Sequence, residues 1–258
     1  MKPFGSDRFG SKRWGGMRFG AGLWGIGGNV IRSINPLLWL DAADSSTFTL
    51  DAGNVTQWRD KSGNGYHYYQ GTDSKRPSYA ANAVTFDGVD EILETLFNTN
   101  TLAITNVLFA GVVETAAKTA LALLLDGYGG GASAERWGLG VDVDPGFDDK
   151  FALAHFGDST EEGISDVLTN NVKFAFMFDY DLTADSCDVY YNGTKSTQAV
   201  AAARTFASNA LMWLGGLNQG FDQWYWNGKL YELAIANYDA VEAKKVQINN
   251  YLMNKWGI

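Results

Sequence analysis

Pairs of carboxylates are the first feature of this sequence that could support catalysis. A glycosidase holds two Asp or Glu side chains on one face of its site, one as proton donor and the other as base or nucleophile. The nearest candidates are Glu91 and Glu94, but they point to opposite faces if their segment is a strand, because side chains alternate along a strand. We therefore expect no catalytic residues and a protein that is not an enzyme.

Histidine and cysteine chemistry is restricted by number. His67 lies among tyrosines and His155 in an apolar alternation, and neither has a serine motif beside it, so both are expected to be ordinary residues of a sheet. Cys187 is the only cysteine, which excludes an intramolecular disulfide and a multi-cysteine zinc site. We expect Cys187 to be packed within a strand, and these residues predict no cofactor.

Two acidic runs are candidates for a calcium site. Calcium needs several converging oxygen ligands, and neither run has the fixed glycine and final glutamate of the calcium loop in helix–loop–helix proteins. The first run is Asp142, Asp144, Asp148 and Asp149, and the second is Asp179, Asp181 and Asp185. We therefore expect both to be solvated acidic loops. The alternative is a calcium ion bound by Asp142, Asp144 and Asp148.

An aromatic cluster near residue 225 could bind sugars by stacking and hydrogen bonding. Asp222, Trp224, Tyr225 and Trp226 form this candidate glycan-binding site. If the segment is a strand, the two tryptophans share one face and belong to the core, which leaves only Tyr225 pointing outward. Burial of the cluster in the core is thus the alternative to a binding site.

The first 35 residues carry a repeat in which an aromatic residue followed by glycine recurs at every fifth position. This period fits neither a helix nor a strand, and the glycine-rich segment buries too little to fold alone. We predict that residues 1–35 form an extended basic arm whose rings dock into pockets of a partner, with an unspecific tail as the alternative. The predicted docking residues are Phe4, Phe9, Trp14, Phe19 and Trp24, with Arg8, Arg13 and Arg18.

Charge is divided unevenly along the chain. Residues 1–35 contain six basic residues and one acidic residue, a net charge of +5, so residues 36–258 carry −14 of the total of −9. Such an acidic body repels the nucleic-acid backbone, and only the arm could contact DNA. No apolar run is long enough for a membrane helix, and no secretory signal is evident, so we expect synthesis in a cytoplasm and no membrane partner.

From residue 36 onward, short apolar runs and alternations separated by turn residues predict an all-β fold, a two-sheet sandwich or a barrel. Asn192-Gly193 predicts a hairpin with a type I′ turn, and the strict alternation over 137–143 predicts a half-buried strand. The other expected strands cover 37–40, 83–86, 107–113, 121–125, 151–155, 172–178, 211–214 and 230–235.

A single helix is predicted over residues 239–256. Asp239 and Glu242 have the spacing of a capping box at its start. The residues expected on its buried stripe are Val241, Ile248, Leu252 and Trp256, with Lys244, Lys245, Asn249 and Asn250 elsewhere.

Five blocks within residues 36–258 have a recognisable pattern. They are LWLDAAD over 38–44, VTQWRDKSGNG over 55–65, FDGVD over 86–90, NGKLYELAI over 227–235 and YLMNKWG over 251–257. Together they resemble the laminin-G-like, concanavalin-A-like jelly rolls of phage and bacterial structural or surface proteins. The resemblance implies a two-sheet antiparallel jelly roll that often binds glycans or proteins at its rim, sometimes with calcium.

We therefore predict a virion structural protein of a phage, a capsid decoration, head fibre or tail appendage, held in the particle by its arm. Its expected partners are other virion proteins and surface glycans, and homo-oligomerisation stays open. A glycan-binding adhesin module is the alternative. A polysaccharide-degrading glycosidase would need the carboxylate pair that the sequence lacks, and an arm that grips DNA fits its regular rings less well than protein pockets do.

Overall fold

The computed structural model describes residues 30–102, 105–116, 122–127, 137–142, 150–155, 160–163, 168–200, 206, 210–217 and 224–258. All eight predicted docking residues of the arm lie outside these ranges, as do Asp144, Asp148 and Asp222.

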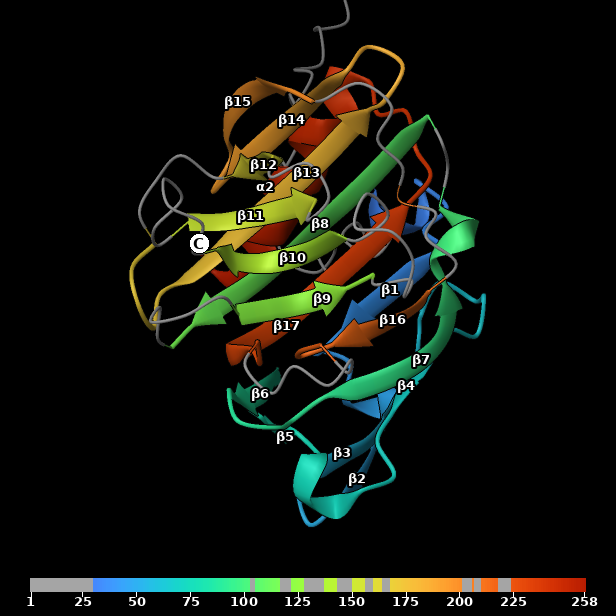
Figure 1. The fold of residues 1–258 in the computed structure, drawn as a ribbon, viewed down its shortest axis with the longest axis vertical. Coiled ribbons are helices and arrows are strands. Elements are labelled where there is room, and N and C mark those ends of the chain that lie inside the picture. Colours follow the sequence, from blue (N-terminus) through green and yellow to red (C-terminus); the bar gives the residue numbers. More distant parts are fainter. Residues whose placement is uncertain are drawn as a thin grey trace, which may run out of the picture.

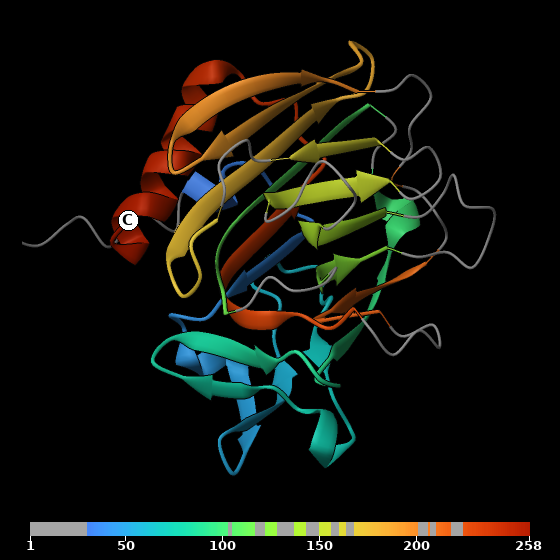
Figure 2. The ribbon, with the colours of Figure 1, turned by 60° about the vertical axis from the view of Figure 1, so that its left-hand side comes forward.

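The strands form two layers, and every strand pair in the described residues is antiparallel (Figures 1 and 2). The predicted all-β sandwich is therefore confirmed. The back layer has the order β15-β14-β13-β8-β17-β1. Its strands are β1 (Leu38–Asp41), β8 (Asn106–Thr115), β13 (Lys173–Asp181), β14 (Ser186–Tyr191), β15 (Thr194–Ala199) and β17 (Asn227–Ala236).

The front layer has the order β12-β11-β10-β9-β16-β7-β4-β3-β2, and β5 and β6 connect β3 to β17 at one end of the sandwich. The strands are β2 (Phe48–Asp51), β3 (Asn54–Trp58), β4 (Tyr68–Tyr69), β5 (Ser78–Ala80), β6 (Ala83–Asp87), β7 (Leu93–Asn98), β9 (Ala122–Asp126), β10 (Trp137–Asp142), β11 (Lys150–His155), β12 (Thr160–Gly163) and β16 (Leu211–Leu214). Short 3₁₀ helices cover Ser45–Thr47, Asp73–Lys75 and Thr99–Thr101.

Aromatic rings from both layers fill the core. The ring of Phe151 on β11 lies 4.8 Å from that of Phe176 on β13, and Trp137 on β10 lies 5.4 Å from Phe109 on β8. β10 is buried on both faces from residue 137 to 141, so the half-buried strand predicted there is wrong. A Cβ on Gly140 would collide with the carbonyl oxygen of Ala122, which leaves no room for an outward side chain.

Helix α2 (Glu242–Trp256) packs on the outer face of the back layer (Figure 2). Its predicted capping box is absent, because Val241 is the extended N-cap residue and the Glu242 carboxylate binds Tyr190 and Lys195 instead. Val241 precedes the first turn and is 69% exposed, so it does not belong to the buried stripe. Asn249, which was placed off that stripe, is buried against Met177 of β13.

Two further local predictions can be compared with the structure. Asn192 and Gly193 have φ values of 45° and 81°, as a type I′ turn requires, so the hairpin is confirmed. Cys187 is buried in β14.

Residues 30–35, which were counted with the arm, pack on the sandwich, where Ile31 and Ile34 are buried in its core. In the described part of the chain, no helix is long and apolar enough to cross a membrane.

Candidate functional site

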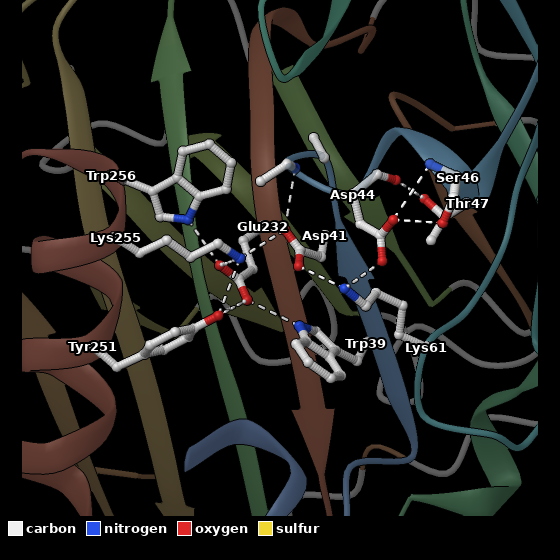
Figure 3. A network of polar contacts seen from close by, with 12 residues as sticks. Trp39, Asp41, Asp44, Ser46, Thr47, Lys61, Glu232, Tyr251, Lys255 and Trp256 are labelled. Atoms are coloured by element: carbon white, nitrogen blue, oxygen red, sulfur yellow. Dashed lines mark hydrogen bonds and ion pairs between the residues drawn. The ribbon is translucent and has the colours of Figure 1, made fainter. Parts of the chain in front are cut away.

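The most connected polar cluster surrounds Glu232 of β17, which has no solvent exposure (Figure 3). Its Oε1 accepts hydrogen bonds from Trp39 Nε1 at 2.9 Å and from the Tyr251 hydroxyl at 2.8 Å. Its Oε2 accepts from Lys255 Nζ at 2.8 Å and from Trp256 Nε1 at 2.7 Å. Four donors therefore compensate this buried charge, and three of them come from the last turns of α2.

Asp41 of β1 extends this cluster toward the loop after β3. Lys255 Nζ donates to its Oδ1 at 2.6 Å, and Lys61 Nζ donates to its Oδ2 at 2.8 Å (Figure 3). The pairing of β17 with β8 shifts register between Leu230 and Glu232. At this irregularity two consecutive residues of β17 both contact Trp256. Tyr231 contacts the Trp256 ring at 5.3 Å between centroids, while Glu232 accepts from its N–H.

A second carboxylate orders the loop over residues 60–66. Asp60 accepts the backbone N–H groups of Trp39, Ser62 and Tyr66, and its own N–H donates to His67 Nδ1 at 3.1 Å. The carboxylates of Glu232 and Asp60 are thus saturated by donors of the protein itself. We interpret these two clusters as structural, because they leave little hydrogen-bonding capacity for a ligand.

The outer face of the front layer differs from these clusters. Strand register places Tyr69 of β4 opposite Glu94 of β7, Glu94 opposite Trp213 of β16, and Trp213 opposite Asp126 of β9. Paired residues of antiparallel strands point to the same face of a sheet. These four residues therefore form one row across β4, β7, β16 and β9, four neighbouring strands labelled in Figure 1, and we call it the ring row.

The ring row points away from the core. Met212 and Leu214, the neighbours of Trp213 along β16, are fully buried, whereas Tyr69 is 39% exposed and Glu94 and Trp213 are half-buried. Asp126 is buried. Within the described ranges, no residue binds the Glu94 carboxylate, the Trp213 indole N–H or the Tyr69 hydroxyl. These groups can accept or donate hydrogen bonds to a ligand without breaking a bond within the protein.

Apolar side chains border the ring row. Leu96 of β7 is 68% exposed and Leu211 of β16 is 42% exposed. Each lies two residues along its strand from Glu94 or Trp213, so it points to the same face. A patch of aromatic and aliphatic surface that contains a few polar groups is typical of a binding surface.

Tyr225 lies beyond the end of the strand that carries Trp213. It forms an isolated parallel bridge with Leu123 of β9 and is half-buried. A Cβ on Gly216 would lie 2.6 Å from Tyr225 Cδ1 and 3.2 Å from Ile92 Cγ2, so the ring packs over this glycine beside Ile92. Tyr225 is thus an aromatic neighbour of the segment that contains Glu91 and leads into β7.

Glu91 is a carboxyl group with an altered pKa. Burial, the nearby charge of Asp87 and that of Asp90 raise its pKa from the ordinary 4.5 to about 7, although the Asp87 N–H donates to its Oε2 at 2.8 Å. Glu91 precedes β7, so the strand alternation considered for Glu91 and Glu94 does not apply. Glu94 alone belongs to the ring row.

The aromatic cluster predicted from the sequence is divided by the structure. Trp226 has no exposure and lies 6.0 Å from Phe151 in the core, whereas Trp224 and Tyr225 are half-buried. The alternative, a strand that buries both tryptophans, does not hold for Trp224, because the regular strand begins only at Asn227. Tyr69 and Trp213 were not among the predicted site residues, since only the pairing of distant strands brings them together.

The weak metal candidates are only partly described. Asp142 is the last residue of β10, and its partners Asp144 and Asp148 lie outside the described residues. Asp181, of the second run, accepts from the Thr183 and Ala184 N–H groups at 3.0 Å in a turn. Within the described ranges, no three His, Cys, Asp or Glu side chains are arranged to hold a metal ion.

Comparison with known proteins shows the fold alone. No protein-family model and no curated protein matches this sequence. A Trypanosoma rangeli sialidase in complex with sialic acid matches with a TM-score of 0.61 and 12% identity, over 90% of this chain and 37% of its own. The chain thus spans well under half of that enzyme.

Two further structures hold sugars on the same fold. The ligand-binding domain of botulinum neurotoxin serotype D, in complex with N-acetylneuraminic acid, has a TM-score of 0.59 and 11% identity over 86% of this chain and 52% of its own. Domain 4 of the arabinanase AbnA from Geobacillus stearothermophilus, in complex with arabinotriose, has a TM-score of 0.52 and 16% identity over 74% of this chain and 92% of its own. The narrower resemblance to laminin-G-like phage proteins stays a prediction.

The expectation that this protein is not an enzyme has to be corrected. It rested on the missing strand motif for two carboxylates, but chains that share the fold include sialidases and a domain of an arabinanase. At these identities the likeness extends to the fold, so it assigns no activity to this chain. The fold and the absent motif therefore do not argue against catalysis.

Replacement of Glu232 should destabilise the protein strongly. Glu232→Gln leaves an amide in place of a carboxylate that faces four donors, and we expect a loss of about 3–5 kcal/mol in the free energy of unfolding by urea denaturation. Glu242→Gln is the control, because Glu242 is exposed and its ion pair with Lys195 should contribute less than about 1 kcal/mol. Equal losses in both variants would contradict the structural role of Glu232.

The raised pKa of Glu91 should appear in the pH dependence of stability. Because this pKa lies above the ordinary 4.5, protonated Glu91 favours the folded state, and its contribution is lost as the pH rises toward and through about 7. Glu91→Gln keeps an acceptor for the Asp87 N–H and cannot ionise. Between pH 5 and pH 8 (~3 pH units), thermal scans should show a smaller fall in Tm for the variant, which should exceed the wild type by about 2 °C at the upper end. An unchanged slope would show that Glu91 does not titrate in this window.

Proposed function

We propose that this chain is a glycan-binding β-sandwich that holds its ligand on the ring row. The observation that carries the proposal is the cross-strand sequence Tyr69, Glu94, Trp213 on one outward face, with polar atoms that no described residue binds. Sugar rings present apolar faces, which stack on aromatic side chains, and hydroxyl edges, which need hydrogen-bond partners. The ring row offers both kinds of contact side by side.

Rigidity also favours a binding role for this face. Trp213 and Glu94 lie on paired strands in the middle of the front layer, and the residues next to each of them along its strand are buried. Side chains on such strands lose little conformational freedom when a ligand binds. Solved proteins of this fold that hold sialic acid or arabinotriose support the class of ligand, although their low identity leaves the residues of this chain as the argument.

The indole of Trp213 should dominate the affinity for a glycan. In Trp213→Ala the stacking surface is removed, and we expect binding to any glycan found on an array to weaken at least about 10-fold in calorimetric titration. Trp213→Phe should retain part of the affinity, because a smaller ring remains. The thermal transition of each variant shows whether it is folded.

A control variant distinguishes an effect at the ring row from a general effect of shortening an exposed apolar side chain. Leu50 of β2 is 43% exposed and lies outside the ring row, so Leu50→Ala should bind glycans like the wild type. If Trp213→Ala also binds like the wild type, the ring row is not the site.

We further propose that the aromatic repeat within residues 1–29 attaches this domain to a larger assembly, for which a phage particle is the best candidate. Five evenly spaced rings support this proposal, because aromatic side chains are typical anchors that fill pockets of a partner surface. Ile31 and Ile34 are buried in the core, and Lys244 Nζ of α2 donates to Ser33 Oγ at 3.1 Å. The chain that leads into the sandwich is therefore anchored at α2.

Removal of the repeat tests this second proposal. A variant without residues 1–29 keeps Ile31 and Ile34 and should fold, but it should no longer co-sediment with the assembly of its source. Replacement of Phe9, Trp14 and Phe19 by serine in the full chain should have the same effect through loss of the anchors alone. Normal incorporation of either variant would refute the attachment role.

A further inference from the structure

We infer that the ring row selects neutral oligosaccharides and rejects acidic ones. This inference rests on the proposed glycan-binding function and goes beyond it, because it assigns the chemical class of the ligand. The solved relatives in fold give no guide here, since one of them holds sialic acid, an anion, and another holds the neutral arabinotriose. The class of ligand therefore has to be inferred from the charges around the ring row.

Carboxylates stand on both sides of Trp213. Strand register places Glu94 and Asp126 opposite Trp213 on its two neighbouring strands, on the same face. Glu94 is half-buried, and within the described residues no lysine or arginine pairs with it. An anionic sugar stacked on Trp213 would therefore lie next to an uncompensated negative charge, where partial burial weakens the screening by solvent.

One cation near the ring row, Arg76, is already engaged within the protein. Arg76 donates through Nε to the carbonyl of Gln70, the residue after Tyr69, at 3.0 Å. The same guanidinium binds Asp51 at 2.9 Å and Asp73 at 2.6 Å, so its charge is balanced within the protein. Further along the surface, the net charge of −14 over residues 36–258 adds to the repulsion of an anion.

A neutral sugar is not repelled by these carboxylates and can form hydrogen bonds with them. A carboxylate is the strongest acceptor that a protein can present to a hydroxyl donor, and Glu94 has capacity for more than one such bond. The Trp213 N–H and the Tyr69 hydroxyl can donate to ring and hydroxyl oxygens of the same ligand. Together these groups can bind the hydroxyl edges of an uncharged chain of sugars.

The spacing of the rings favours an oligosaccharide over a single sugar. Tyr69 and Trp213 are two strand positions apart, with Glu94 between them, which separates their Cα atoms by about 9.6 Å. Two stacking platforms at this separation contact two different rings of a chain. The exposed Leu96 and Leu211 extend the apolar surface beside them.

Matched pairs of glycans test this inference on the full chain. An array that carries neutral, sialylated, sulfated and uronic-acid glycans identifies bound sugars, and each neutral ligand is then titrated against a counterpart that differs only by its acidic group. We expect the neutral member to bind at least roughly 10-fold more tightly at low salt, and the difference to narrow in about 0.5 M NaCl because screening shortens the range of repulsion.

Variants assign the preference to the ring row. Glu94→Gln removes one negative charge and keeps a hydrogen-bond acceptor, so it should reduce the preference for neutral glycans several-fold. Asp185→Asn is the matched control, because this substitution also removes one negative charge. Asp185 is an exposed residue in the turn between β13 and β14, in the other layer. It should leave the preference unchanged.

The possible results separate the two proposals. Equal or tighter binding of the acidic members would overturn the inference while glycan binding itself stands. Equal shifts in Glu94→Gln and Asp185→Asn would also overturn it, because the preference would then follow the overall charge and not this face. If no glycan of any class is bound, the proposed function fails and the inference fails with it.

Discussion

The buried carboxylate of Glu232 is the constraint on which the arrangement of the sandwich depends. A charge without solvent contact has to be compensated, and its four donors come from β1 and from the last turns of α2. Strand β17 lies between β8 and β1 in the back layer, so this one group joins the beginning and the end of the described fold. The position of the helix follows from it, because Lys255 and Trp256 reach the carboxylate only if α2 lies across the outer face of that layer (Figures 2 and 3).

The two faces of the molecule use polar groups in opposite ways. On the back layer the carboxylates of Glu232, Asp41 and Asp179 are covered by α2 and bind its lysines. On the front layer the ring row presents Glu94 without a partner in the described part of the chain. Saturated groups hold the fold, while unsaturated groups beside aromatic rings are available to a ligand, and this difference is the basis for the choice of the front face as the candidate site.

Local patterns predicted the fold class, the main strands, the hairpin at Asn192-Gly193 and the existence of the C-terminal helix, because these depend on alternation, turn residues and periodicity. The helix start was missed, since the carboxylate of Glu242 binds Tyr190 and Lys195 of a hairpin distant in sequence and not its own backbone. The ring row was missed for a similar reason. Tyr69, Glu94 and Trp213 become neighbours through pairing between β4, β7 and β16, and neither their spacing nor their surroundings in the sequence contains that register.

The donors of Glu232 have a consequence for synthesis of the chain. Three of them are among residues 251–256, so a nascent chain that has emerged only as far as β17 contains a carboxylate that cannot be buried without cost. Before α2 docks, Glu232 lies on the open outer face of the back layer, where water can solvate its charge. Docking of the helix buries the carboxylate and brings three of its four donors with it, so the burial of this charge and its compensation are one event.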